Sequence, residues 1–398
     1  MERATKFLAL EGNIRVLALQ TLLGQIGLGM FYVIWQPYIL STGVTLPQLG
    51  VVQTMINIST GLGLFFWGYI SDKYGRKPVI IITIVSRIVS ILFLLLSDSL
   101  WAFLCFGFFM GLTAMFMMGN PARNALITES VDSTQRATAL STLVTIAQGT
   151  STIVATLGGY IALRLGYNPI FLLMVAGDTL GSLVCIRYLR ETLEKKEDTT
   201  EKKTIRERLR HSFVPEKPLV RLYLALLCMG FSYTVAYSLL YGALSETFGF
   251  TTVQLGFLST AFNLTWAVGS IPLGKLVDKI GRRKGLLMSM AMALVTPIGF
   301  LFSDRIEHFI FFYAFSAVDI GFWMPSYTSY ITETVKPEKR STVFGKVDAY
   351  GKIGSLPAAW IAGLLYGNYG FYAPMYVQIA VILIITILVA GLKEPERV

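Results

Sequence analysis

A single carboxylate, Asp319, lies near the middle of the long apolar stretch 308–332 and is the residue best placed for chemistry. An ionisable group in the middle of a membrane costs about 2.5–3.5 kcal/mol on insertion scales, so such a group faces a cavity or a partner. A carboxylate there can take up and release a proton or another cation. We therefore predict that Asp319 is a coupling carboxylate. The alternative is a neutral carboxyl group that forms hydrogen bonds for structural reasons alone.

A second set of charges lies in the apolar stretch 342–366. Asp348 and Lys352 are four positions apart, so on a helix their side chains share one face and can form an ion pair. Such a pair can bind a carboxylated solute or respond to protonation, and Asp348 is therefore a second candidate for ion coupling. The alternative is a mutually neutralised pair near one surface of the membrane.

Uncharged polar and aromatic side chains recur at helical spacing in two further apolar stretches. Gln25, Tyr32 and Gln36 are separated by seven and four positions, which places them on one face of a helix. Tyr233 and Tyr237 are four positions apart and share a face in the same way. For any one of these residues, packing or an interhelical hydrogen bond is the favoured interpretation. Together they indicate a polar, aromatic pocket with few fixed charges.

The residue patterns of common enzyme classes are missing from the sequence. It contains no Gly-x-x-x-x-Gly-Lys-Ser/Thr loop that could bind a nucleotide. It shows no spacing of histidines, cysteines and carboxylates that suits a metal, and no credible pair of nucleophile and base. We therefore expect no enzyme activity, no metal site and no cofactor.

The composition is that of a membrane protein. Of its 398 residues, 54% are hydrophobic and only 15% are charged, whereas soluble domains carry about 25% charged residues. Many apolar stretches reach the roughly 20 residues that a helix needs to cross the hydrocarbon core. The sequence therefore predicts an all-α membrane protein with twelve transmembrane helices. The predicted spans are residues 16–40, 49–70, 79–97, 100–127, 138–163, 169–189, 219–246, 253–277, 285–303, 308–332, 342–366 and 373–392.

Basic residues in the loops give the orientation. The net charge is +10, and the basic residues lie in short loops between apolar stretches, which fits a membrane protein better than a nucleic-acid-binding one. Loops on one side carry nearly all of these residues, whereas Arg164 and Arg305 are the only ones on the other side. Because excess Lys and Arg marks the cytoplasmic side, we expect both termini in the cytoplasm. We expect a multi-pass protein of the cytoplasmic (inner) membrane, without disulfides and without a cleavable signal.

One charged motif occurs twice. Residues 68–78 read Gly-x-x-x-Asp-x-x-Gly-Arg-Lys, and they include Asp72 and Arg76. The motif returns 206 positions later, with Asp278 and Arg282 in the corresponding places. A short cationic loop at the same point of two apolar halves indicates a duplicated membrane protein.

A second repeat supports the duplication. Residues 121–129 begin with Pro and end with Ile-Thr-Glu129, and residues 325–333 repeat this pattern 204 positions later, ending with Glu333. The similar offsets indicate that each half contains six helices in the same order. Parallel repeats of six helices are a known plan of membrane transporters.

The repeats predict a division into three parts. Residues 1–190 form the first six-helix bundle, residues 191–218 a cytoplasmic linker, and residues 219–398 the second bundle. Ile205, Leu209 and other apolar residues of the linker recur at helical spacing among arginines, which predicts an amphipathic helix on the anionic inner leaflet. The alternative is an ordinary tether between the two bundles.

At these repeated motifs the chain resembles the major facilitator superfamily. The resemblance covers nearly the whole chain and implies a monomer with two pseudo-symmetric six-helix bundles. Two features common in drug/proton antiporters of that family are missing. Gly107 stands where they carry an arginine in helix 4, and Val154 and Ala155 stand where they carry Gly-Pro in helix 5.

The resemblance implies a conformational latch on the cytoplasmic side. Arg76 would pair with Glu129, and Asp72 would lie at the start of the helix 342–366. By the repeat, Arg282 would pair with Glu333. The alternative is that these charges only set the topology. The predicted latch residues are Asp72, Arg76, Glu129, Asp278, Arg282 and Glu333.

The resemblance also implies which helices line the solute cavity. In the family these are helices 1, 4, 7 and 10, with helices 2, 5, 8 and 11 beside them. Helices 3 and 6 lie on the outer flank, where we expect Arg87 and Asp178 to pair with each other. The predicted cavity residues are Gln25, Tyr32, Gln36, Asn57, Gln148, Tyr233, Tyr237, Asn263, Trp266, Trp323 and Lys352.

The function implied is secondary active transport of a small organic solute by alternating access of the two bundles. We expect coupling to a proton or another cation, a neutral or moderately hydrophobic solute, and efflux in preference to uptake. One alternative is an uptake permease, a symporter or uniporter for a neutral metabolite or sugar. Two others are a membrane sensor without transport and a membrane-embedded enzyme. The expected partners are the solute, the coupling ion and the lipid bilayer, and no nucleic acid.

Overall fold

The computed structural model describes residues 8–114, 120–132, 135–193, 215–216 and 219–394. Within these ranges the chain consists of helices joined by short loops, and no β-strand occurs there. Nine helical stretches in the described part are long and apolar enough to cross a membrane. The predicted all-α, multi-span architecture is confirmed.

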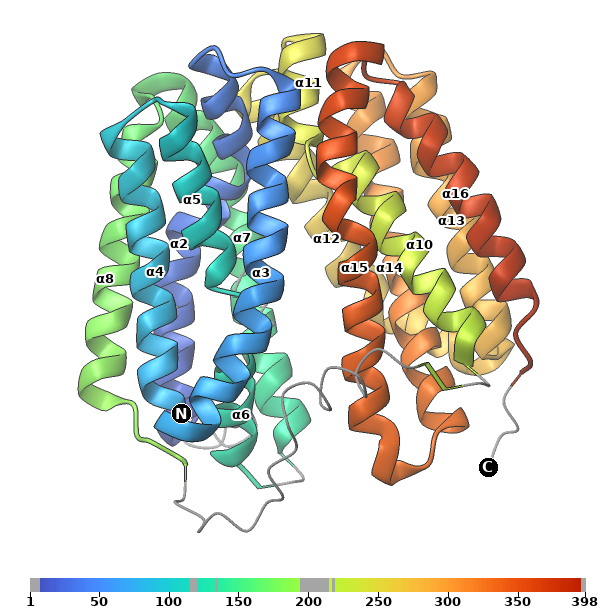
Figure 1. Cartoon of the computed structure of the whole chain (residues 1–398), viewed down its shortest axis with the longest axis horizontal. Helices are drawn as coiled ribbons and strands as arrows, with labels where there is room; N and C mark the ends of the chain where they lie inside the picture. Colours follow the sequence, from blue (N-terminus) through green and yellow to red (C-terminus); the bar gives the residue numbers. More distant parts are fainter. Residues whose placement is uncertain (1–7, 115–119, 133–134, 194–214, 217–218, 395–398) are drawn as a thin grey trace. The chain divides into compact units, whose positions relative to one another are not determined.

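The chain separates into two compact units (Figure 1). Unit 1 comprises Met1–Glu197 with Thr251–Gly256, and unit 2 comprises Asp198–Phe250 with Phe257–Val398. The helices of the first half are α2 (Gly12–Ser41), α3 (Leu46–Tyr74), α4 (Arg76–Leu96), α5 (Leu100–Leu112), α6 (Pro121–Glu129), α7 (Arg136–Leu165) and α8 (Asn168–Tyr188). Those of the second half are α10 (Val220–Tyr237), α11 (Leu240–Phe248), α12 (Thr252–Ile280), α13 (Arg282–Leu301), α14 (Ile306–Thr334), α15 (Pro337–Tyr369) and α16 (Ala373–Ala390).

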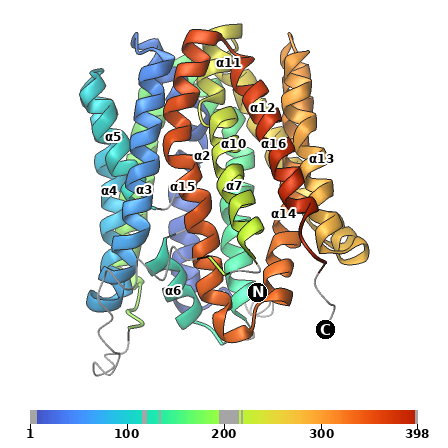
Figure 2. The same ribbon diagram turned by 45° about the vertical axis from the view of Figure 1, so that its right-hand side comes forward.

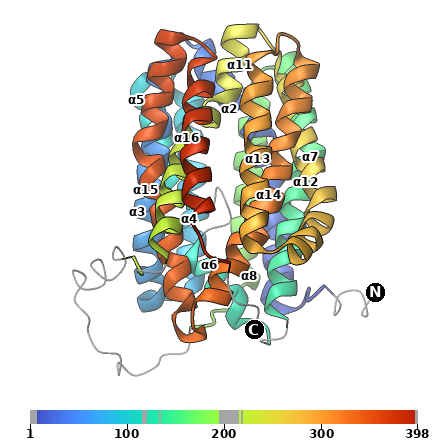
Figure 3. The same cartoon turned by 90° about the vertical axis from the view of Figure 1, so that its right-hand side faces the viewer.

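Each unit has its own packing and its own hydrophobic core. In unit 1, α2 packs against α7 and α8, while α5 packs against α3 and α4. In unit 2, α10 packs against α15 and α16, and α13 packs against α14 (Figures 2 and 3). Buried side chains such as Leu17 and Leu126 form the core of unit 1, and Leu222 and Ile331 belong to that of unit 2. The predicted amphipathic linker helix lies outside the described residues and stays a prediction.

The predicted span 100–127 is wrong as one continuous helix, because it is divided into α5 and α6. Ala114 follows α5 with a φ of 48°, a left-handed conformation that interrupts a helix. Asn120 caps α6, since its side chain accepts a hydrogen bond from the Arg123 N–H at 3.2 Å. Proline lacks an N–H and disfavours a helical residue before it, so Pro121 begins a new helix.

The predicted span 219–246 is also interrupted, between α10 and α11. The Tyr366 hydroxyl donates a hydrogen bond to the Ala236 carbonyl at 2.5 Å. In a continuous helix this carbonyl would accept from the N–H group four residues later. A side chain inserted into the helical ladder is a known cause of a break. Tyr233 and Tyr237 therefore precede the interruption, and the helical face that they share ends there.

Arg87 on α4 and Asp178 on α8 form a buried ion pair, as predicted. The Arg87 Nε donates to Asp178 Oδ2 at 2.7 Å, and a second contact joins Nη2 to Oδ1. A Cβ on Gly24 would lie 2.9 Å from Asp178 Oδ1 and 3.0 Å from Arg87 Nη2. The absence of a side chain at Gly24 therefore lets α2 lie against this pair.

The Arg87–Asp178 pair yields a stability prediction. Arg87→Met and Asp178→Leu should each destabilise the protein by about 3–5 kcal/mol, because each leaves the other charge buried and unpaired. The double variant should be much less destabilised than either single one, because an apolar pair of similar volume has no charge to compensate. Thermal unfolding in detergent measures all three variants. Additive losses in the double variant would contradict the prediction.

Candidate functional site

The Arg76 guanidinium connects three helices of unit 1. Its Nε and Nη2 donate to Glu129 Oε1 at 3.3 and 3.0 Å, which ties α4 to α6. Its Nη1 contacts Asp72 and donates to the Ser71 hydroxyl at 3.0 Å, which ties α4 to α3. The Thr192 hydroxyl donates to Glu129 Oε2 at 2.6 Å, so the chain after α8 joins the same network.

Unit 2 contains the corresponding network. Arg282 donates to Glu333 Oε1 from Nε at 2.9 Å and from Nη2 at 2.8 Å. Its Nη1 donates to Asp278 Oδ1 at 2.7 Å. Both predicted ion pairs, Arg76–Glu129 and Arg282–Glu333, are therefore present. Their role as a latch, and the place of Asp72 at the helix 342–366, stay predictions.

A further carboxylate completes each network. Glu191, just after α8, accepts from the first two N–H groups of α4 at 2.8 and 3.0 Å. Glu394, just after α16, accepts from the first two N–H groups of α13 at 2.6 and 3.0 Å. The start of a helix carries unsatisfied donors and a partial positive charge, which a carboxylate neutralises. The chain after α8 is therefore fastened to the start of α4, and the chain after α16 to the start of α13.

Two structural features favour glycine at the position directly before α4 and before α13. Gly75 has a φ of 109° and Gly281 a φ of 96°, a region that side chains disfavour. A Cβ on Gly75 would lie 2.5 Å from Glu191 Oε2, and one on Gly281 would lie 2.6 Å from Glu394 Oε1. The motif glycine thus provides both the turn and the room for the capping carboxylate.

Sequence reasoning missed Glu191 and Glu394. They are 203 positions apart, close to the offsets of the other two repeats, and each directly follows the last helix of its half. Extending the internal repeat to the ends of the two halves would have indicated them. Their partners are backbone N–H groups, however, which no side-chain motif reveals.

Hydrogen bonds lower the pKa of two of these carboxyls. Burial by itself raises the pKa of Glu129, but hydrogen bonds from Arg76 and Thr192 outweigh it, and the pKa lies below its ordinary value. Burial likewise raises the pKa of Glu191, and the backbone N–H groups that it accepts from lower it overall. Both groups therefore stabilise the fold in the ionised form.

Asp319, on α14, is fully buried in unit 2, with 0% of its surface exposed. Its Oδ1 accepts a hydrogen bond from the Ser289 hydroxyl on α13 at 2.5 Å, and its Oδ2 accepts one from the Tyr233 hydroxyl on α10. Among the residues that the structure describes, no basic side chain forms an ion pair with it. The carboxyl group is thus held by neutral hydroxyls from two other helices.

Further aromatic rings pack beside Tyr233 and elsewhere in unit 2. The Tyr237 ring lies 5.7 Å from the Tyr233 ring and 6.0 Å from the Tyr313 ring, measured between centroids. Trp323, a predicted cavity residue, stacks on Tyr327 at 5.9 Å and belongs to the hydrophobic core of unit 2. The remaining predicted residues of α12, Asn263 and Trp266, are half-buried.

The charged residues of α15 do not form the arrangement that we expected. Asp348 and Lys352 are both exposed and interact electrostatically, but their charged atoms are too far apart for a salt bridge. A spacing of one helical turn allows two side chains to form an ion pair but does not require it. Lys346 instead forms an ion pair with Glu216, with Nζ 2.7 Å from Oε1.

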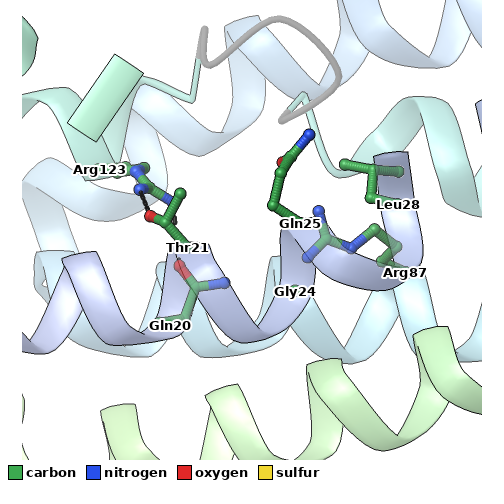
Figure 4. Close-up of a pocket in the computed structure, with 7 residues that line it drawn as sticks. All are labelled: Gln20, Thr21, Gly24, Gln25, Leu28, Arg87 and Arg123. Carbon is green, nitrogen blue, oxygen red and sulfur yellow. Dashed lines mark hydrogen bonds between the residues drawn. The ribbon is translucent and has the colours of Figure 1, made fainter. Parts of the chain in front are cut away.

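Unit 1 contains a small polar cavity of about 30 Å³ (Figure 4). Gln25 lines it, and its Nε2 also donates to the Ser151 hydroxyl at 2.6 Å, while its place in a solute cavity stays a prediction. The lining residues are Gln20, Thr21, Gly24, Gln25, Leu28, Arg87 and Arg123. Arg123 lies within the repeat 121–129 but was not predicted as a site residue.

The other predicted cavity residues of unit 1 lie elsewhere. Gln36 is buried, and Tyr32 is exposed. Gln148 and Asn57 are half-buried, and Asn57 accepts a hydrogen bond from Gln53 Nε2 at 3.2 Å. None of these four residues lines the cavity around Arg123, and their role with a solute stays a prediction.

The capping carboxylate gives a pH prediction. Glu191→Gln should destabilise the protein at pH 7 by about 1–3 kcal/mol, because charge-assisted hydrogen bonds are lost. The pKa of Glu191 is lower in the folded protein than the roughly 4.3 of an unfolded chain. Its contribution is therefore complete above about pH 5 and is lost as the pH falls through the folded pKa.

Unfolding temperatures measured from about pH 8 to about pH 3.5 test this prediction. As the pH falls into the acid range, the unfolding temperature of the variant should decrease less steeply than that of the wild type, because the titrating carboxyl is gone. Glu246→Gln, which changes an exposed carboxyl, is the control and should keep the wild-type profile. Parallel profiles for Glu191→Gln and the wild type would rule the prediction out.

Comparison with known proteins places this architecture in one family. A family model described as Major Facilitator Superfamily matches residues 17–242 and 222–398. The multidrug resistance protein MdtG of Dickeya zeae (strain Ech586) is 24% identical over 342 residues, which cover 84% of this chain and 82% of that protein. MdtG of Proteus mirabilis (strain HI4320) is 23% identical over 347 residues, with coverage of 84% and 82%.

Solved structures show the same fold. A mutant of the nucleoside transporter NupG aligns with a TM-score of 0.79 at 10% identity, covering 96% of this chain and 100% of that one. An inward-facing bacterial homologue of the iron transporter ferroportin aligns with a TM-score of 0.75 at 14% identity, covering 95% and 97%. The chain belongs to the Major Facilitator Superfamily, and it is therefore a multi-pass membrane transporter and not an enzyme.

Proposed function

We propose that this protein is a proton-coupled transporter that exports a small organic solute across the cytoplasmic membrane by alternating access. The observation that carries the coupling is the environment of Asp319. An ionised carboxylate buried without a cation is costly, and the hydrogen-bond partners of Asp319 among the described residues are the hydroxyls of Tyr233 and Ser289. Asp319 therefore carries a proton while it is buried between α10, α13 and α14, and it releases the proton when these helices separate.

The direction of transport rests on the relatives. The MdtG proteins are named for multidrug resistance, and export of a compound is one way in which a transporter protects a cell. The missing arginine at Gly107 and the missing Gly-Pro at Val154 and Ala155 weigh against a typical drug/proton antiporter. Uptake of a neutral metabolite or sugar is the second candidate, since both directions use the same fold.

The two arginine networks support a latch that operates between conformations. Arg76 and Arg282 each join three chain segments through carboxylates that remain partly exposed. Because these carboxylates reach solvent, they can change partners when the conformation changes. We place them on the cytoplasmic side, together with both termini, because the basic loops lie there. The protein acts as a monomer in the bilayer in this proposal.

Asp319→Asn tests the coupling. In proteoliposomes the variant should lose solute accumulation driven by a pH gradient, because the amide cannot exchange a proton, while downhill exchange of solute continues. Asp304→Asn is the matched control, since its side chain is 76% exposed and should leave accumulation unchanged. Accumulation that persists in Asp319→Asn at the wild-type rate would refute the coupling role.

The latch is tested by a pair of charge changes in one loop. Arg76→Gln removes the contacts with Asp72 and Glu129, and should shift the balance of inward- and outward-facing states by roughly 10-fold (about 1.4 kcal/mol). Lys73→Gln removes the same charge from an exposed neighbouring position and should not shift it. Distances between spin labels on the two units report the populations. Equal effects of both variants would favour the topology-only alternative.

A further inference from the structure

The cavity of unit 1 contains more positive than negative charge. Two guanidinium groups line it, those of Arg87 and Arg123 (Figure 4). Asp178 pairs with Arg87 and thereby neutralises it. Among the described residues no carboxylate forms an ion pair with Arg123. One positive charge is therefore left uncompensated beside this cavity.

The contacts of Arg123 are polar but neutral. Its Nη1 donates to Gln20 Oε1 at 3.0 Å, and its Nη2 donates to the Thr21 hydroxyl at 2.5 Å. Its side chain is nevertheless buried, with 5% of its surface exposed. A buried charge in a membrane protein pairs with a counter-charge or marks the path of a ligand. Amide and hydroxyl groups orient this guanidinium without removing its charge.

The internal repeat shows that this charge is not part of the common framework. The segments 121–129 and 325–333 share their proline and their final Ile-Thr-Glu, but Tyr327 occupies the place of Arg123. In unit 2 that tyrosine stacks on Trp323. The second bundle therefore forms the same helices without a cation at this position, so the arginine serves a purpose specific to unit 1.

The cavity suits one small, flat anionic group. Its volume of about 30 Å³ exceeds the space of a single water, which needs about 10–15 Å³, but does not admit a whole organic solute. A guanidinium presents a planar fork of donors that matches a carboxylate. The half-buried Gln25 also lines the cavity and provides an amide (Figure 4).

We propose that Arg123 binds the carboxylate of the solute, so that the transported compounds are organic acids. The cavity receives the charged group, and the rest of the molecule stays outside it. This inference rests on the proposed transport function and replaces the expectation of a neutral solute. Gln20 and Thr21 act as positioning residues, because they hold the guanidinium rather than the solute.

Equilibrium binding to the full-length protein in detergent tests the proposal without any gradient. Benzoate and benzamide have nearly the same shape and differ in charge, as do octanoate and octanamide. The wild type should bind at least one of these acids about 10-fold or more tightly than its amide, as charge-assisted hydrogen bonds predict. Arg123→Gln should abolish this preference, and Arg123→Lys should retain part of it.

Controls separate a binding effect from a folding defect. Arg136→Gln changes an exposed arginine that follows the same segment, and should bind acids like the wild type. Gel filtration and thermal unfolding show whether Arg123→Gln remains folded. If this variant does not fold, the decisive data are the binding by Arg123→Lys and the comparison of acids with amides in the wild type. Chloride and inorganic phosphate are tested as separate probes.

Several results would overturn the proposal. These are equal binding of acids and amides by the wild type, no binding of either acid, or an acid preference that survives in Arg123→Gln. An Arg123-dependent response to chloride or phosphate alone would indicate an inorganic-anion site instead of an organic-acid site. None of these results depends on flux or on Asp319, so a failure of the transport proposal is recognised separately by the absence of solute movement in proteoliposomes.

Discussion

Charges among apolar helices must be compensated by protein groups, because no water is present there to solvate them. The chain meets this requirement in different ways. Arg87 and Asp178 neutralise each other completely, and the arginine networks around Arg76 and Arg282 combine two carboxylates each. Among the described residues, the hydrogen-bond partners of Asp319 are hydroxyl groups. These differences in compensation separate structural charges from those available for a proton or a ligand.

The duplication divides the chain into a shared framework and a set of unique residues. Both halves contain the motif arginine, its glutamate partner and a carboxylate that caps the helix beginning at that arginine, α4 or α13. Because the same contacts occur in both halves, these contacts are explained by the fold. Asp319 and Arg123 have no charged counterpart at the repeat-related positions. The residues that we propose to bind a proton or a solute therefore lie at positions where the two halves differ.

An acid-binding arginine in one half and a protonatable carboxyl in the other would have complementary roles. Arg123 favours a ligand that carries negative charge, and Asp319 favours a proton while it is buried. Each lies within the helices of its own unit. A solute and a coupling proton could thus bind at different groups, with the conformational change rather than direct contact linking them.

The sequence by itself determined the all-α membrane architecture and the internal repeat, while the resemblance to the family indicated the pairs Arg76–Glu129 and Arg87–Asp178. Hydrophobic length, motif spacing and the scarcity of buried charges are properties of the chain that hold before it folds. Only the tertiary structure decided the helix breaks before Pro121 and between α10 and α11, the capping role of Glu191 and the lack, among the described residues, of an acidic partner for Arg123. Each of these depends on which helix faces meet and which backbone groups are left unsatisfied, and neither hydropathy nor spacing along the chain contains that information.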